Sequence, residues 1–145
     1  MPPHRLVRST ARVVGVLGLG TLSVLHAIWA GGSPWPARSR QRLAELVVGQ
    51  RAALPASGPT AAVSVCAGVA AVAAAGHLGG GRLTRMGLRA LGVALLLRAL
   101  VGGAPALAVL GLPPTGAAFR RADRRLYRPV AAVLGASLCV ISSHA

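Results

Sequence analysis

The segment "VVGVLGLGTLSVLHAIWA", residues 13–30, contains eighteen consecutive residues without a charged side chain. An α-helix of this length, rising about 1.5 Å per residue, extends about 27 Å, close to the roughly 30 Å hydrocarbon core of a bilayer. A short basic tail precedes the segment, and a connector rich in Gly, Pro, Ser and Arg follows it. The pattern predicts a membrane-spanning helix, with a signal peptide cleaved after Ala30 as the alternative.

Three more apolar segments follow along the chain. Together with the first, they predict spans near residues 13–30, 60–78, 86–104 and 130–143. We expect Pro105 to end the third helix and Pro129 to open the fourth, because proline is tolerated at the start of a helix and disrupts its interior. The sequence therefore predicts an all-α fold, a transmembrane four-helix bundle, with residues 1–145 forming a single integral membrane domain.

Small residues mark the second predicted span. Ala67, Ala71 and Ala75 recur at four-residue spacing, with Gly68 and Gly76 beside them. Such residues let the backbones of two helices approach closely in a membrane. A buried alanine helix of a soluble bundle is the alternative.

The charge of the chain is strongly basic and unevenly distributed. All sixteen basic residues are arginine, the acidic side chains are Glu45 and Asp123, and the net charge is +14. A soluble domain that binds nucleic acid is the rival explanation, but only four aromatic residues are available to stack on bases, and the arginines lie between the apolar segments. Arginines in that position favour anionic lipid headgroups. We expect the lipid bilayer as partner, with anionic lipid or another membrane protein as further candidates, and no nucleic acid.

The first connector contains "RLAELVVGQRAAL", residues 42–54, in which apolar residues recur at helical spacing. This spacing predicts a short helix lying on the bilayer surface, with Arg42, Glu45 and Arg51 facing water. A plain loop is the alternative. The connectors leave orientation open: a cytoplasmic amino terminus places six arginines inside and an external one places nine, while the arginines flanking the first helix are evenly matched.

Arg98, within "ALLLRALVGG" at residues 94–103, is the main candidate functional residue. An arginine at the centre of a membrane helix costs about 2.5 to 3.5 kcal/mol on insertion scales, so its charge must be compensated. Ala90, Ala94 and Gly102 share its face at four-residue spacing, and we expect this face to meet other helices. The functional hypothesis is a polar site between helices for a lipid headgroup, an anion or a partner protein. The structural alternatives are that Arg98 reaches an interface or binds carbonyl groups of a neighbouring helix.

Four other residues are candidates for the same site. Asp123 is a possible partner of Arg98, although a solvated pair within "RRADRR" explains it equally well. His26 can form hydrogen bonds across helices or titrate. Trp29 and Tyr127, together with Trp35, are expected to anchor the membrane interfaces.

No motif predicts catalysis, a metal site or a cofactor site. Neither carboxylate has a second one near it in sequence, so general acid and base catalysis has no visible residues. Cys66 and Cys139 form no zinc motif and are read as small hydrophobic residues, with a disulfide as the alternative if their helices touch. His26 and His77 would be a minimal pair for haem. We therefore expect a non-enzymatic multi-pass membrane protein without cofactors, the alternative being a small transporter or a cofactor-binding redox subunit.

Two stretches, "LHAIWAGGSPW" and "FRRADRRLYRPVAAVLG", resemble the paired signatures of a bacterial family of small four-span membrane proteins, domain of unknown function 3995, and "LLLRALVGG" is similar to its third helix. The likeness covers nearly the whole chain and implies a multi-pass protein of the bacterial plasma membrane. The arginine-rich first connector and Arg128 depart from the family pattern. The matching motif positions are His26, Trp29, Gly31, Gly32, Arg98, Asp123, Tyr127 and Pro129.

Overall fold

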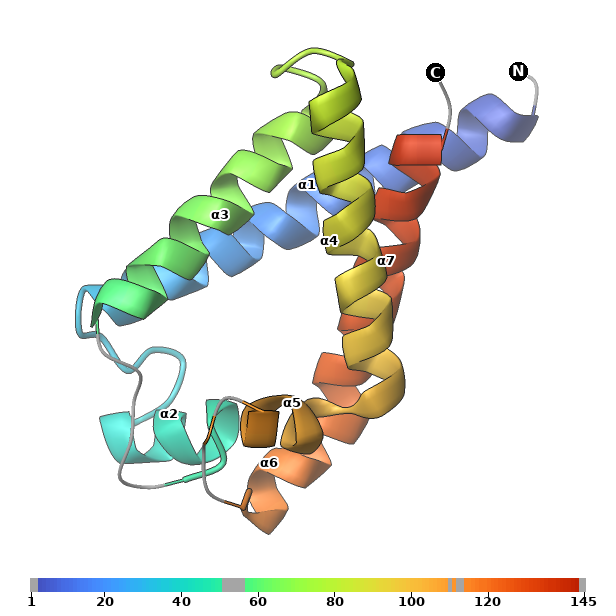
Figure 1. The fold of residues 1–145 in the computed structure, drawn as a ribbon. Helices are drawn as coiled ribbons and strands as arrows, with labels where there is room; N and C mark the ends of the chain where they lie inside the picture. The colour runs from blue at the N-terminus through green and yellow to red at the C-terminus, as the bar shows by residue number, and fades with distance from the viewer. Residues whose placement is uncertain (1–2, 51–56, 110, 112–113, 144–145) are drawn as a thin grey trace.

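A computed structural model of the chain describes residues 3–50, 57–109, 111 and 114–143, and these contain helices and no strand. The four long helices are α1 (Pro3–Ala30), α3 (Ser57–Ala75), α4 (Arg82–Val101) and α7 (Arg128–Ser143) (Figure 1). The shorter elements are α2 (Arg40–Val47), α5 (Gly103–Val109), α6 (Ala117–Ala122) and the π-helix η1 (Asp123–Tyr127). The all-α prediction is confirmed.

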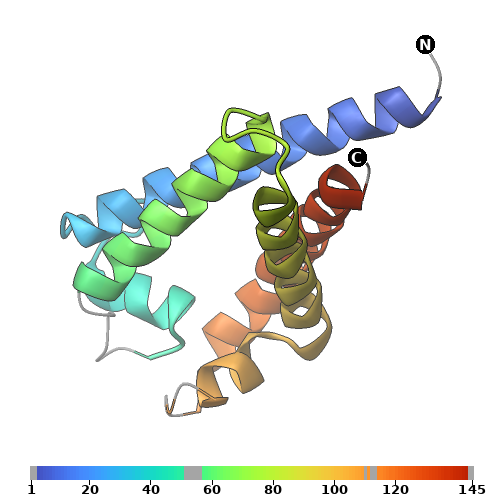
Figure 2. The same ribbon diagram turned by 45° about the horizontal axis from the view of Figure 1, so that its top comes forward.

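The long helices form two antiparallel pairs, α1 with α3 and α4 with α7. The pairs meet at one end of the molecule, where α1 also packs against α7, and they diverge towards the other end. Both chain termini and the α3–α4 connection lie at the closed end, whereas α2, α5 and α6 lie at the open end (Figures 1 and 2). The bundle is therefore a wedge.

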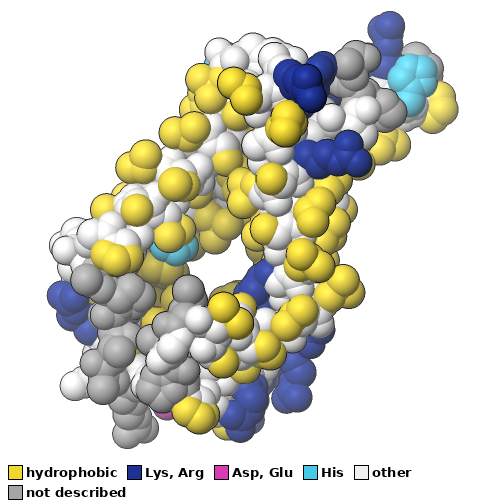
Figure 3. Space-filling model, in the orientation of Figure 1, with side chains coloured by type: hydrophobic (Ala, Val, Ile, Leu, Met, Phe, Trp, Pro, Cys, Tyr) yellow, Lys and Arg dark blue, Asp and Glu magenta, His cyan; other side chains and the backbone are white. Residues whose placement is uncertain are grey.

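The core lies where the two pairs meet. Leu19 of α1, Ala74 of α3 and Leu138 of α7 are buried there together with Leu88 of α4. Most other large apolar side chains point outward, and they cover the long helices in the space-filling view (Figure 3). Three helical stretches are long and apolar enough to cross a membrane, and a fourth is added if α4 and α5 are counted as one bent span. An outward-facing apolar surface on such helices suits lipid as the surrounding solvent.

Each helix pair is joined by a contact between small residues. In the α1–α3 pair, the hydroxyl groups of Ser23 and Ser64 each donate to the other residue's carbonyl oxygen, both at 2.8 Å. In the α4–α7 pair, Gly92 faces Gly135 so closely that a Cβ atom on Gly135 would lie 2.7 Å from the Gly92 carbonyl oxygen. Polar bonds and close backbone approach are the interactions that hold helices together where lipid removes the hydrophobic drive for association.

The predicted end of the third helix was wrong, whereas the fourth predicted segment agrees with α7. Helix α4 stops at Val101 because Gly102 adopts φ +91°, and Pro105 lies in the first turn of α5, where a proline is tolerated. Pro129 lies in the first turn of α7, as predicted, although helical structure continues back through η1 and α6 to Ala117. The wider π-helical turn directly before Pro129 accommodates a ring that would clash with the preceding turn of a regular α-helix.

The first connector contains the predicted helix, α2, with Ser39 as its N-cap. Leu43 and Ala44 are buried, and α2 contacts α6, so the apolar side of this helix packs against the protein. Arg42 pairs with Glu45 at 2.9 Å. The last four residues of the predicted segment, 51–54, which include Arg51 and Leu54, lie outside the described residues.

Candidate functional site

The charge of Arg98 is compensated by Asp123. The Arg98 Nη2 atom lies 2.6 Å from Asp123 Oδ1, and the backbone N–H of Gly103 donates to Asp123 Oδ2 at 2.9 Å. The Asp123 side chain is 8% exposed and the Arg98 side chain 26% exposed. Both carboxylate oxygens therefore have donors, as a carboxylate removed from water requires.

The bend between α4 and α5 places the Gly103 amide beside Asp123. The helix axis changes direction by 112° between α4 and α5. Gly102 at this bend has a left-handed φ that favours glycine. Gly103 has no room for a side chain, because a Cβ atom there would lie 2.5 Å from Arg98 Nη2 and 2.6 Å from the Phe119 ring. Gly102 and Gly103 thus allow the backbone N–H of Gly103 to come within hydrogen-bond distance of the Asp123 carboxylate.

Arg128 holds the end of α4 in place. Its Nε donates to the carbonyl oxygen of Ala99 at 2.7 Å, and its Nη2 donates to that of Leu100 at 2.6 Å. These carbonyl groups belong to the last turn of α4 and have no acceptor role inside the helix. The guanidinium groups of Arg98 and Arg128 accompany a single carboxylate, so the site carries one positive charge in excess.

Arg98 also lines a central cavity of about 500 Å³ between the two helix pairs. Its second terminal nitrogen, Nη1, is buried and has no hydrogen-bond partner. Figure 3 shows the hollow as an opening through the middle of the molecule. Arg98 therefore lines the cavity while its buried Nη1 lacks an acceptor among the described residues, which is costly unless a further acceptor is bound.

The remaining wall of the central cavity is apolar apart from three polar side chains. His26 Nδ1 donates to the Leu22 carbonyl oxygen at 2.8 Å, which leaves Nε2 without a bond in the described structure. The Trp29 and His26 rings contact each other at a tilt of 55°, with their centroids 4.9 Å apart. The Tyr127 hydroxyl donates to the Leu46 carbonyl oxygen at 3.1 Å. The apolar side chains of the wall include Leu22, Val63, Leu95, Leu107, Phe119 and Leu134.

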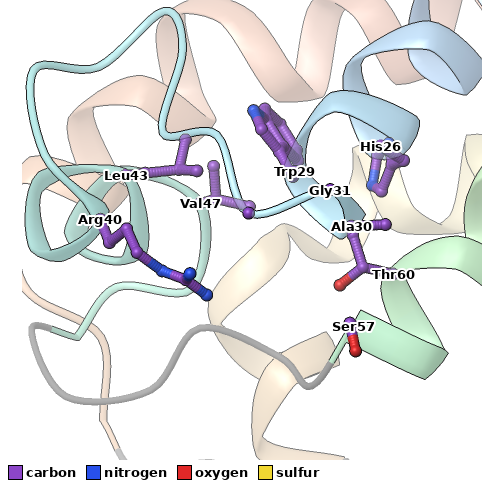
Figure 4. A pocket seen from close by; sticks show the side chains of 10 residues that line it. His26, Trp29, Ala30, Gly31, Arg40, Leu43, Val47, Ser57 and Thr60 are labelled. Carbon is purple, nitrogen blue, oxygen red and sulfur yellow. The ribbon is translucent and has the colours of Figure 1, made fainter.

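A second cavity of about 390 Å³ adjoins the first at the open end of the wedge. His26, Trp29 and Val47 line both cavities. Figure 4 shows Arg40 of α2 reaching towards this space from the side opposite Thr60 at the start of α3. The central cavity therefore continues towards α2 past the two rings of α1.

The structure brings together every candidate taken from the sequence. His26, Trp29, Arg98 and Tyr127 line the central cavity, and Asp123 is bonded behind Arg98. Trp29 and Tyr127 were expected to anchor interfaces, but both side chains form hydrogen bonds within the protein, Trp29 Nε1 to the Trp35 carbonyl oxygen at 2.7 Å.

The predicted small-residue face of α4 was wrong although Arg98 does point inward. Ala90 and Ala94 are exposed, and Gly92 is the residue packed on α7. A four-residue repeat rotates by about 40° per step around an α-helix, so Ala90 lies well away from the face of Arg98. The role of Gly92 and Gly135, and that of Ser23 and Ser64, was missed; small and hydroxyl residues within apolar runs were the available signal.

The residues considered for a cofactor lie apart. His26 lies near the start of α3, with Ser57 and Thr60 around the same cavity, whereas His77 follows the end of that helix. These two side chains therefore do not face a common haem. Within the described residues, no three His, Cys, Asp or Glu side chains group as metal ligands, and Cys66 and Cys139 are both free thiols.

Comparison with known proteins gives one match. The family described as "Protein of unknown function (DUF3995)" matches residues 19–138, from α1 to α7. This range includes His26, Arg98 and Asp123. Neither a curated protein nor a solved structure matches the chain.

Proposed function

The chain belongs to the DUF3995 family of proteins of unknown function, and we propose that it is a multi-pass protein of the bacterial plasma membrane whose central cavity binds the acidic group of an amphiphile. It acts by binding and not as an enzyme. The ligand is a carboxylate or phosphate carried on an apolar chain.

The observation that carries this proposal is that Arg98 lines the cavity and that its buried Nη1 has no acceptor among the described residues. Arginine presents five N–H donors in a planar fork that suits carboxylate and phosphate oxygens. Asp123 occupies one side of that fork. The excess positive charge left by Arg98 and Arg128 supports an anion as the second acceptor, and the apolar wall supports an apolar chain attached to it.

Trp29 provides a direct assay, because it lines the cavity and Trp35 is the other tryptophan of the sequence. Purified Trp35→Phe protein in detergent is titrated with dibromostearate, whose bromine atoms quench a neighbouring indole. We expect saturable quenching of Trp29, and weaker quenching by the uncharged dibromostearyl alcohol.

The variant that tests the site in this assay is Arg98→Leu combined with Asp123→Asn, which removes both charges and keeps an acceptor for the Gly103 amide. We expect it to lower the affinity by about tenfold or more, the loss of one charge-assisted hydrogen bond. Arg89→Leu, an exposed arginine of the same helix, is the control and keeps wild-type affinity. Equal quenching in all three proteins rejects the proposal.

Transport of the same ligand is a second candidate, favoured by the broken α4–α5 helix beside the ion pair. Discontinuous helices at polar sites are a recurring feature of secondary transporters. Flux of the labelled amphiphile across proteoliposomes, abolished by the Arg98→Leu and Asp123→Asn double substitution, distinguishes transport from binding alone.

A further inference from the structure

A basic cleft lies at the closed end of the wedge, far from the central cavity. We define it by Arg8 and Arg12 of α1, Arg85 of α4, and an apolar floor of Ala74, Leu88 and Ile141. Its volume is about 500 Å³. Arg8 and Arg85 are half-buried and Arg12 is exposed. Figure 3 shows several basic side chains at this end of the molecule.

Arg12 and Arg85 of the basic cleft lie away from both acidic side chains of the sequence. The sequence has two, and the structure places both, Glu45 on α2 and Asp123 in η1, at the open end (Figure 1). Arg12 and Arg85 make no ion pair or hydrogen bond with their side chains among the described residues. A bound anion would supply the counter-charge that the described residues do not give these two arginines.

The start of α4 adds to the positive potential. Gly79 and Gly80 line the cleft just before this helix, and Thr84 and Arg85 line it from the first turn. The first turn contains no acidic residue, and the N-cap Gly81 has no side chain to bond the free amides. The amino end of a twenty-residue helix carries partial positive charge that favours a phosphate.

The position of the cleft identifies the source of the phosphate. Arg12 directly precedes the uncharged segment of α1, and Arg85 lies at the beginning of α4, so both stand where the apolar stretches end. In a membrane-inserted protein this is the depth of lipid headgroups. The apolar floor can take the first part of an acyl chain, which a free phosphate ion lacks.

We infer that the basic cleft binds the phosphate of an anionic phospholipid. Arg12 and Arg85 hold the phosphate oxygens, and Leu88 and Ile141 contact the acyl chain. The inference rests on the membrane insertion in the proposed function and is independent of the central cavity.

The test is native mass spectrometry of the detergent-purified full chain with phosphatidylglycerol. Arg12→Gln combined with Arg85→Gln is compared with Arg5→Gln combined with Arg89→Gln, which removes the same charge from the same two helices outside the cleft. We expect the cleft variant to lose affinity by about thirtyfold relative to this control, since each of the two arginines near anionic lipid contributes about 1 kcal/mol. Arg12→Lys with Arg85→Lys keeps the charge and is expected to retain an intermediate affinity.

Three further arms decide the outcome. Phosphatidylcholine measures binding without net lipid charge and is expected to bind weakly to all variants. Equal losses in the cleft variant and its control would show general surface attraction and overturn the inference. Inorganic phosphate that displaces phosphatidylglycerol at comparable concentration would also overturn it, because the acyl chain would then contribute nothing. Arg98→Leu with Asp123→Asn removes the proposed central site, and the cleft substitutions are expected to lower phosphatidylglycerol affinity by the same factor in this background, so a failed central cavity leaves this result unaffected.

Discussion

Removal of the Asp123 carboxylate is expected to destabilise the protein strongly. In Asp123→Ala, Arg98 loses the oxygen at 2.6 Å and the Gly103 amide loses the oxygen at 2.9 Å. Breaking a buried ion pair by removing one partner costs about 3 kcal/mol at the lower end of the usual range, which suits an arginine that is a quarter exposed. The orphaned amide adds about 1 kcal/mol, so we expect a loss of about 4 kcal/mol in the free energy of unfolding.

The double variant Arg98→Leu with Asp123→Asn separates charge from packing. It leaves no unpaired charge, and the side-chain amide introduced at position 123 can still accept from the Gly103 N–H, so we expect its stability to lie within about 1 kcal/mol of the wild type. Unfolding in mixed micelles with increasing dodecyl sulfate, followed by far-UV circular dichroism, measures both free energies. If Asp123→Ala unfolds at the same detergent fraction as the wild type, or if the double variant is the less stable of the two, the ion pair does not compensate Arg98 as described.

Three other substitutions test the packing. Gly135→Ala forces α4 and α7 apart at Gly92 and is expected to cost about 1 to 3 kcal/mol in the same unfolding assay, and an unchanged midpoint would contradict the close contact. Ser23→Ala and Ser64→Ala form a double-mutant cycle with an expected coupling of about 1 kcal/mol, whereas strictly additive effects would mean that the two hydroxyl groups do not interact. Arg128→Gln removes two charge-assisted bonds to the end of α4 and is expected to cost about 2 kcal/mol, with less than half recovered by Arg128→Lys, which has one donor group in place of a fork.

Hydropathy predicted the long helices well because it depends on local composition. Each of the four predicted segments corresponds to a long helix, including the alanine-rich α3. The end of the third helix was predicted less well, since the rule based on Pro105 ignored Gly102, where the backbone conformation ends α4. A left-handed φ at a glycine has no hydropathy signal, and glycine is also common inside packed helices.

The candidate residues were found because each is chemically unusual for its position. A charge at Arg98 must be compensated in an apolar segment, and the sequence has just two acidic side chains to do so. The sequence therefore identifies Asp123 as one of two possible partners of Arg98. It does not predict the unpaired Nη1 atom of Arg98 or the hydrogen bonds of Arg128 to carbonyl groups, because these depend on where the end of α4 lies relative to η1.

The amino-acid sequence by itself determined that the chain is helical, apolar enough for lipid and marked by one arginine that needs a partner. These are properties of short segments, and the cost of burying a charge or an unbonded backbone is the same in any arrangement of helices. Only the tertiary structure decided that Arg98 pairs with Asp123, that the helix pairs diverge around a cavity, and that arginines from α1 and α4 share a cleft. Those contacts join residues 25 or more positions apart, and they exist because Gly102 turns the chain and small residues set how closely the helices cross.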